Sequence, residues 1–485
     1  MTTTAIQHFT KYILLNVICC FSFFTASCQN NVSDQPLPYS YVIDDTNNII
    51  VWNTSEILNT GNWSSFNFDG SYQLETSISE ISKNQTYQVT KDNKAYTVYP
   101  TRFPVIHISA KDSIIDAPKI AAEFRYYDKD TSFVSTIGIE HRGNISLKFP
   151  KKSFDIEFWD DEISKESKDL SFNGLREDDD FVLDAMYNEP LRMRANFSQQ
   201  LWRAIHTPYY IDEEPEAKSG IGEQYVEVFV NNEYQGIFLM VDQVDRKLLK
   251  LKKKEEGIVR GELYKAAYYQ GATEFKEAPE FKSSLPHWGG FRLEYPDVED
   301  YVYFFDNIQK TTAFVVNASE EEFAANYTTH FNEQNLIDYY LFINLLRGTD
   351  NLGKNYYIAK YNTNTPYFIV PWDLDGVLGT VIDGREMNIT TDILSNHLFS
   401  RLWDENPNEY RKKVIARWQE LRQSHFKDEA LFGTITNHIT KFNEQHVFER
   451  EALLWKQGHD DKDLLFMTTW LKKRLAFLDA HFIDE

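Results

Sequence analysis

Cysteine is scarce in this chain of 485 residues, which contains only three. Cys19, Cys20 and Cys28 all lie near the N-terminus, so the rest of the sequence has neither a thiol nor a disulfide. A large domain without disulfides must be stabilised by its hydrophobic core alone. The composition allows such a core, because 42% of the residues are hydrophobic and 15% are aromatic. The length predicts a globular protein with more than one domain.

An excess of basic charge is also absent, because 50 Lys and Arg residues stand against 73 Asp and Glu residues, for a formal net charge of −23. A protein that binds a nucleic-acid backbone or an anionic membrane surface typically has a basic face. We therefore expect no nucleic-acid partner. The simplest role of the negative charge is solubility in water.

Residues 12–24 form an apolar run that is too short to span a bilayer comfortably. The small residues that follow it predict a signal peptide over residues 1–27. A cysteine directly after small residues resembles a bacterial lipoprotein signal. We therefore expect an exported protein at the cell envelope or surface, anchored to a membrane by a lipid on Cys28, with residues 28–38 as a polar tether. An ordinary signal peptide, cleaved nearby without lipidation, is the alternative.

Residues 39–102 alternate short apolar and polar stretches with Asn, Gly and Asp at the turns. This pattern predicts a small β module. It contains no recognisable chemistry, so a structural or docking role is expected.

From Phe103 the sequence predicts longer strands, one of which is the alternating stretch 151–158. Phe154, Ile156 and Phe158 share one face of that strand, and a period of two residues places Lys152 on the same face. An inward-facing lysine is rare unless it meets an anion, which suggests contact with phosphate. A lysine at the frayed start of the strand, reaching out to water, is the alternative.

The next segments predict a helix, a hairpin and a second helix. The helix covers residues 191–205, begins after Glu189 and Pro190, and carries Arg192 and Arg194 in its first turns, where arginines are either exposed or bound to phosphate. The hairpin covers residues 225–241. Asp242 and Gln243 follow it and open a basic helix over residues 246–254.

Residues 336–346 are apolar nearly all round, which predicts a buried helix that ends at Gly348. The loop after it carries Asp350 and Asn355, and two apolar strands then lead to Asp373. This layout suits phosphoryl transfer, in which one carboxylate orients or deprotonates a hydroxyl while an amide and a second carboxylate hold Mg²⁺. The Asp-x4-Asn pattern alone is weak. Helical segments such as 410–421 and 464–482 follow.

The order of these elements is that of a protein kinase, and several motifs resemble the CotH kinase family. The resemblance covers residues 103–402 and leaves 403–485 as a helical extension on the large lobe. It implies an α+β, atypical kinase-like fold of two lobes. The motifs that carry it are His141-Arg142-Gly143, Pro150-Lys151-Lys152-Ser153-Phe154, Phe229-Val230-Asn231-Asn232-Glu233-Tyr234-Gln235-Gly236 and Pro371-Trp372-Asp373-Leu374-Asp375.

The resemblance also implies roles for individual residues. Asp350 is expected to be the catalytic base, with Asn355 and Asp373 as ligands of Mg²⁺ or Mn²⁺. The residues expected to contact ATP are Lys152, Arg142, Asp242 and Gln243. The implied reaction is transfer of phosphate from ATP to Ser or Thr of an exported protein, or to the chain itself.

The sequence departs from conventional kinases in three respects. It has no Gly-rich GxGxxG loop before Lys152, no Asp-Phe-Gly, and no carboxylate inside the helix after the strand lysine, where kinases place the partner of that lysine. A silent kinase-like scaffold that binds protein or polysaccharide is therefore an alternative function. A metal-dependent hydrolase is the weakest alternative, because no His cluster accompanies the carboxylates.

Overall fold

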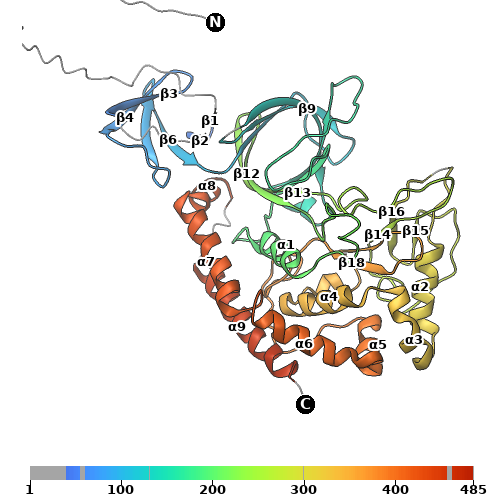
Figure 1. Ribbon diagram of the computed structural model, residues 1–485. Coiled ribbons are helices and arrows are strands. Elements are labelled where there is room, and N and C mark those ends of the chain that lie inside the picture. The colour runs from blue at the N-terminus through green and yellow to red at the C-terminus, as the bar shows by residue number, and fades with distance from the viewer. Residues whose placement is uncertain (1–39, 55–60, 130, 299, 456–460, 484–485) are drawn as a thin grey trace, which may run out of the picture.

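The computed structural model describes residues 40–54, 61–129, 131–298, 300–455 and 461–483. The chain is α+β, with β-rich N-terminal parts and helices toward its C-terminus (Figure 1). The predicted signal peptide, tether and lipidated Cys28 lie outside the described residues. Within the described residues, no helix is long and apolar enough to cross a membrane.

The first sheet forms where the sequence predicted a small β module. Its six strands lie in the order β1-β2-β6-β5-β4-β3. Aromatic side chains such as Trp52, Phe66 and Tyr72 are buried at its core. The strands are β1 (Tyr41–Asp44), β2 (Ile49–Asn53), β3 (Trp63–Asn67), β4 (Ser71–Ile78), β5 (Tyr87–Lys91) and β6 (Lys94–Thr101).

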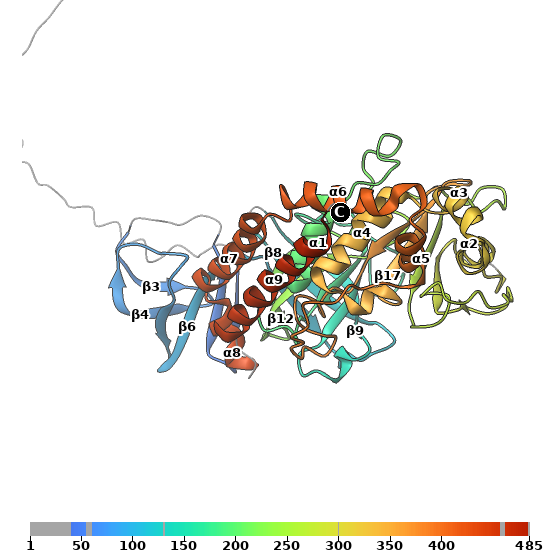
Figure 2. The ribbon, with the colours of Figure 1, turned by 90° about the horizontal axis from the view of Figure 1, so that it is seen from below.

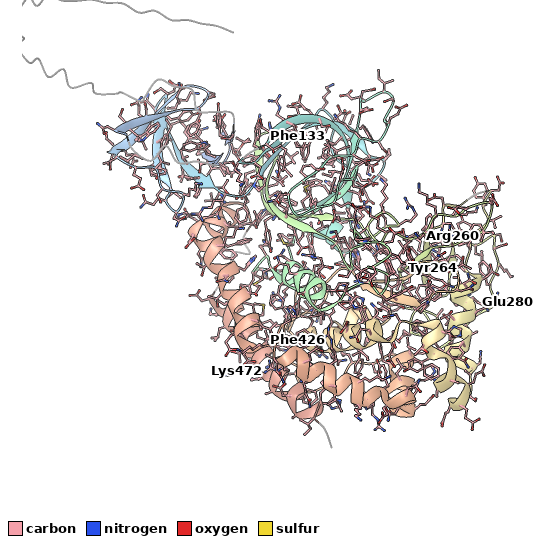
Figure 3. The ribbon with its side chains drawn as sticks, viewed as in Figure 1. Phe133, Arg260, Tyr264, Glu280, Phe426 and Lys472 are labelled. Carbon is pink, nitrogen blue, oxygen red and sulfur yellow. The ribbon has the colours of Figure 1, made fainter. Side chains whose placement is uncertain are left out.

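The next seven strands close into a barrel, in the order β10-β11-β13-β12-β7-β8-β9. The alternation of each strand sends one set of apolar side chains inside, including Phe154, Ile156 and Phe158. Figure 3 shows side chains, among them Phe133, filling the barrel. The barrel interior is therefore a packed core. The strands are β7 (Val105–Ala110), β8 (Ile120–Tyr127), β9 (Ser132–Arg142), β10 (Ser153–Trp159), β11 (Asp180–Asp184), β12 (Glu223–Val230) and β13 (Glu233–Asp242).

The third sheet packs with helices from the middle of the chain. Its strand order is β15-β16-β14-β17-β18. Helix α4 (Glu333–Leu346) is buried from Asn335 onward, as its apolar sequence predicted, and it packs against β18. The other elements here are α1 (Arg194–Ile205), β14 (Glu262–Ala266), β15 (His287–Trp288), β16 (Phe291–Tyr295), α2 (Asp306–Asn317), α3 (Glu320–His330), β17 (Tyr356–Lys360) and β18 (Tyr367–Pro371).

The last helices connect distant parts of the molecule. Helices α6 and α9 pack on α4, whereas α8 packs on the barrel strand β13. Figures 1 and 2 show α7 and α8 reaching from this helical region to the N-terminal sheet. These helices are α5 (His397–Glu405), α6 (Tyr410–Arg422), α7 (Asp428–Glu444), α8 (Val447–Leu454) and α9 (Asp461–His481).

Two local expectations were wrong. Residues 246–254 form turns rather than a basic helix, because the Asp245 carboxylate accepts a hydrogen bond from the Leu248 amide (2.6 Å) and Lys250 adopts a left-handed backbone. Helix α4 ends at Leu346, where the apolar stretch ends, but the left-handed residue that caps it is Arg347 (φ of 54°) rather than Gly348. The Arg347 guanidinium pairs with Asp392 (2.8 Å). The two-lobed, kinase-like arrangement remains a prediction.

Candidate functional site

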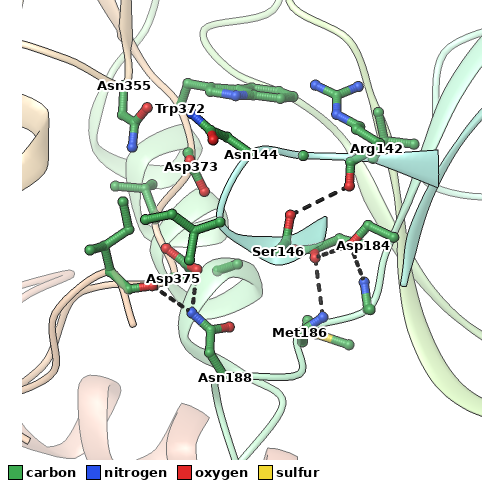
Figure 4. Close-up of a pocket in the computed structure, with 18 of the residues that line it drawn as sticks. Arg142, Asn144, Ser146, Asp184, Met186, Asn188, Asn355, Trp372, Asp373 and Asp375 are labelled. Atoms are coloured by element: carbon green, nitrogen blue, oxygen red, sulfur yellow. Dashed lines mark hydrogen bonds between the residues drawn. The ribbon is translucent and has the colours of Figure 1, made fainter. Parts of the chain in front are cut away.

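A cavity of about 520 Å³ lies against the outer face of the barrel. Its walls come from the loop after β9, the strands β10, β11 and β13, the strand β14, and the loops before β17 and after β18. Both acidic and basic side chains belong to the lining. Figure 4 shows Asp373 and Asp375 on the loop after β18 and Asp184 on a separate stretch of chain.

The loops that carry Asn355 and Asp373 are bonded directly to each other. The Trp372 amide donates to the Asn355 carbonyl (3.1 Å), and the Asn351 side-chain amide donates to the carbonyls of both Asn355 (2.7 Å) and Trp372 (2.8 Å). Asn355 and Asp373 have φ angles of 56° and 53°, a left-handed conformation that Asn and Asp tolerate better than most residues. Both side chains therefore reach the cavity from a locally fixed backbone.

Asp350 lies beside Asn355, in the short 3₁₀ helix Thr349–Leu352. Its Oδ2 accepts a hydrogen bond from the Asn355 side-chain amide (2.9 Å), and Lys354 Nζ lies 3.8 Å from the same oxygen. Burial raises the pKa of Asp350, Lys354 lowers it and the charge of Asp373 raises it further. The structure thus brings Asp350, Asn355 and Asp373 together, although Asp350 lies next to the cavity rather than in its lining.

The carboxylates that line the cavity repel one another. Burial raises the pKa of Asp375 well above its usual range, and the charge of Asp373 adds to this effect. Burial and Asp373 also raise the pKa of Asp184. The Asn188 side-chain amide donates to Asp375 Oδ2 (2.7 Å) and lowers its pKa in part. A divalent cation would relieve this repulsion, and carboxylate and amide oxygens are the ligands that Mg²⁺ and Mn²⁺ prefer, so the residues present fit such an ion.

Basic side chains complete the lining: Arg142, Lys151, Lys265, Arg292 and Lys354. Lys265 forms no ion pair within the part of the chain that the structure describes, and its Nζ lies 5.3 Å from the ring centres of both Tyr357 and Trp372. Burial and the charges of Arg142 and Arg292 lower the pKa of Lys265 to about 8. Arg142 stacks on the same Trp372 ring at 5.6 Å and pairs with Asp155 (2.9 Å).

Of the two lysines directly before β10, Lys151 lines the cavity and Lys152 does not. The alternation predicted for this strand is correct, and Phe154, Ile156 and Phe158 share one face. That face, however, is the packed barrel interior, whereas the cavity lies on the face of Lys151 and Ser153. Lys152 instead donates from Nζ to the Leu147 carbonyl (2.6 Å) at the start of the strand.

Asp242 and Gln243 are also absent from the lining of this cavity, although the neighbouring Val241 belongs to it. Asp242 is buried and binds backbone instead. Its carboxylate accepts hydrogen bonds from the amides of Gly222 (2.9 Å) and Arg176 (3.1 Å). In this structure the residue organises the loops beside β13.

Arg192 and Arg194 are neither exposed nor directed at a ligand. Both are buried, at 1% and 2% exposure. Arg194 pairs with Glu189 (2.6 Å), whose carboxylate also accepts from the Leu191 and Arg194 amides at the start of α1. Arg192 pairs with Glu451 of α8 (2.8 Å). The structure therefore shows neither of the two expected roles, exposure to solvent or contact with phosphate, for these arginines.

Several lining residues were not singled out from the sequence. Asp375 belongs to the recognised motif Pro371-Trp372-Asp373-Leu374-Asp375, and its position two residues after Asp373 could have identified it as a second metal ligand. Asp184 lies at the end of β11 and Lys265 lies within β14, and the sequence did not show which way these strands face. Glu451, which binds Lys151 (2.9 Å), comes from a helix far along the chain and had no local signal at all.

The sequence matches known proteins over most of its length. The family model for CotH kinase protein matches residues 139–478, which extends well past residue 402 and includes α8 and most of α9. Inner spore coat protein H of Bacillus subtilis (strain 168) is 24% identical over 292 residues, which are 60% of this chain and 72% of that protein. Because the family model covers well over half of the sequence, this chain belongs to the CotH kinase family.

Proposed function

We propose that this protein is an atypical protein kinase that transfers the γ-phosphate of ATP to a Ser or Thr hydroxyl of another protein, or of its own chain. The observation that carries the proposal is that carboxylates and basic side chains line the same cavity. Phosphoryl transfer depends on positioning and on neutralising the charge of the triphosphate, which requires cations from the protein and carboxylates for a metal ion.

The basic residues are suited to the phosphates. Lys265 forms no ion pair within the described part of the chain, and Lys151 and Arg142 line the same cavity. The carboxylates of Asp373 and Asp375, with the side-chain oxygen of Asn355, would hold Mg²⁺ or Mn²⁺. When bound, the ion would neutralise negative charge on the phosphate oxygens.

Asp350 is suited to receive the acceptor hydroxyl. Its side chain is 26% exposed, so a hydroxyl can approach it, and the bond from Asn355 fixes its orientation. Its raised pKa makes it a better proton acceptor than an ordinary carboxylate once ionised. Asp350 would orient the hydroxyl and accept its proton as the oxygen attacks the γ-phosphorus.

The proposal is tested by incubating the purified chain with γ-labelled ATP and Mg²⁺ or Mn²⁺, with and without an added protein acceptor. We expect label on the wild type, none on Asp373→Ala because nucleotide and metal binding are lost, and retained nucleotide binding without turnover for Asp350→Ala. The matched control is Asp212→Ala, an exposed aspartate outside the cavity lining. Absence of label with both metals, or full activity of Asp373→Ala, would contradict the proposal.

We also propose that the protein is exported and anchored through a lipid on Cys28. The support is the sequence alone, namely the apolar run 12–24 and the small residues before Cys28. Metabolic labelling with a fatty acid should mark the wild type and not Cys28→Ser. Equal labelling of both would exclude this anchor.

A further inference from the structure

A buried carboxylate from α8 contacts the cavity lysine. Glu451 Oε1 accepts hydrogen bonds from Lys151 Nζ (2.9 Å) and from the Ile237 amide (2.7 Å). Its Oε2 accepts from Arg192 Nη2 (2.8 Å) and Nε (3.2 Å). The side chains of Glu451, Lys151 and Arg192 are each no more than 2% exposed, so one carboxylate balances two buried cations.

The barrel strand β13 leaves room for this carboxylate at Gly236. A Cβ atom at this position would lie 2.0 Å from Glu451 Oε1 and 3.1 Å from Lys151 Nζ. Gly236 also has φ of 103°, which favours glycine. Because Gly236, the last residue of the motif that starts at Phe229, has no side chain, the Glu451 carboxylate can approach the strand closely.

Arg192 links Glu451 to a carboxylate of the cavity lining, Asp375. Its Nη1 donates to the carbonyls of Met186, Tyr187 (3.1 Å) and Glu189 (3.0 Å), and so holds the turn that includes Asn188. The Asn188 side chain in turn donates to Asp375 (2.7 Å; Figure 4). Glu451 thus contacts the lining residue Lys151 directly and is linked to the lining residue Asp375 through Arg192 and Asn188.

We propose that Glu451 is a positioning residue for phosphoryl transfer, which sets Lys151 on the cavity wall and, through Arg192, sets Asn188 against Asp375. The inference rests on the proposed kinase function. In protein kinases a glutamate from the helix after the lysine strand orients that lysine. Here the acid at the start of α1, Glu189, is engaged with Arg194, and the glutamate comes instead from α8, 300 residues after Lys151 in the chain.

The test compares Glu451→Asp and Glu451→Gln with the wild type in the same phosphoryl-transfer assay. Aspartate keeps the negative charge, so the buried cations stay balanced. Its side chain is shorter by one methylene, so the carboxylate lies farther from Lys151 and Arg192. Because a displacement of about 1 Å at a catalytic group can cost about 100-fold in rate, we expect kcat/KM for ATP to fall by about that factor. Glutamine keeps the size and loses the charge, and we expect a loss at least as large.

The matched control is Glu227→Gln. Glu227 is fully buried and pairs with Arg450, the neighbour of Glu451 on α8, but it does not line the cavity. A purely structural role for Glu451 predicts that all three variants lose thermal stability and keep the kinetic constants of the wild type, per folded molecule. The proposal predicts that kcat and KM change only in the Glu451 variants.

The pH profile supplies a second readout. Burial lowers the pKa of Lys151 to about 8, and the Glu451 charge opposes that effect. Loss of this charge in Glu451→Gln lowers the lysine pKa further, so the alkaline limb of kcat/KM should move to lower pH. If the Glu451 variants have wild-type kinetic constants and an unchanged alkaline limb of the pH profile, the inference about Glu451 is wrong, while the proposed kinase function stands. If Glu451→Gln does not fold, the kinetics of Glu451→Asp provide the test. A wild type without phosphoryl transfer would remove both the function and the inference.

Discussion

Two adjacent lysines have different surroundings at the start of β10. Lys151 is buried at 1% exposure between the cavity and Glu451, whereas Lys152 binds the Leu147 carbonyl. The alternation of this strand was predicted correctly, but the pattern does not show which face of the strand meets the cavity. The reason is that the apolar residues identify only the face that packs in the barrel interior. The outer face of a barrel can also be covered by other elements, and the pattern does not show this.

The lysine pair allows a direct test. Replacing Lys151 by Met should lower kcat/KM for ATP about 100-fold, because a fixed cation near the phosphates is lost. Lys152→Met, one residue away, is the matched control and should retain wild-type kinetics. A larger loss for Lys152→Met than for Lys151→Met would contradict the assignment of Lys151 to the phosphates.

The carboxylates of the cavity predict how stability depends on pH and metal. Asp375 has a folded-state pKa raised by burial and by Asp373, so the folded chain binds its proton more tightly than the unfolded chain does. The metal-free protein should therefore lose stability as pH rises from the usual aspartate range, near 4, through this raised pKa.

Two thermal-melting series check this expectation. Asp375→Asn should flatten the decrease of Tm with pH, and Mg²⁺ should raise the wild-type Tm more at pH 8 than at pH 5, since only ionised carboxylates bind the ion. An equal Mg²⁺ effect at both pH values would contradict the assignment of Asp375 as a metal ligand. The control variant is Asp383→Asn, an exposed aspartate near the same loop.

At the scale of elements, much of the fold follows from sequence patterns. Alternation predicted β10, the hairpin signal at 225–241 predicted β12 and β13, and the apolar stretch 336–346 predicted the buried α4, whereas β11 was not predicted. Closure of the barrel was not predicted, because it depends on pairing between β7 and β12, which are far apart in the chain. The turns at 246–254 were missed because side-chain bonds of Asp245 compete with the helix that the basic residues favoured.

The packing of α8 on β13 predicts an effect at Gly236. Alanine there would place its Cβ 2.0 Å from Glu451 Oε1 and would occupy a backbone conformation that costs L-residues about 1–2 kcal/mol. We expect Gly236→Ala to lower the free energy of unfolding by at least this amount and to reduce phosphoryl transfer, as measured by denaturant titration and by the labelling assay.

The control is Gly433→Ala in α7. A Cβ at Gly433 has no neighbour within 4 Å among the described atoms, and alanine favours a helix by about 0.5–1 kcal/mol relative to glycine. This variant should be as stable as the wild type or slightly more stable. Wild-type stability and activity in Gly236→Ala would mean that α8 can shift away from β13 without consequence.

At the scale of the molecule, three regions meet at α8. Glu451 binds the cavity-lining Lys151, Arg450 pairs with Glu227 of the barrel and stacks on Tyr99 of the first sheet at 5.1 Å, and Glu449 accepts a hydrogen bond from the Tyr99 hydroxyl (3.0 Å). These contacts join residues that are hundreds of positions apart. The sequence therefore indicated the Asp350, Asn355 and Asp373 loops but gave no sign that the last helices complete the site.

A truncation tests this dependence. A chain that ends at residue 402, where the resemblance was expected to end, lacks Glu451 and uncovers the face of α4 that packs on α6 and α9. We expect this chain to be poorly soluble and to transfer no phosphate, as judged by sedimentation and by the labelling assay. An active, soluble product would place the whole functional unit before residue 403.

The position of Glu451 also bears on the order in which the site is made. A ribosome releases the chain from its N-terminus, and every residue that lines the cavity precedes residue 383. Lys151 and Arg192 therefore emerge long before the carboxylate that neutralises both of them. If Glu451 has the proposed role, a nascent chain that has not yet reached residue 451 contains all of the cavity residues but does not hold them in the active arrangement. Synthesis of the last helices then serves as the step that turns the enzyme on.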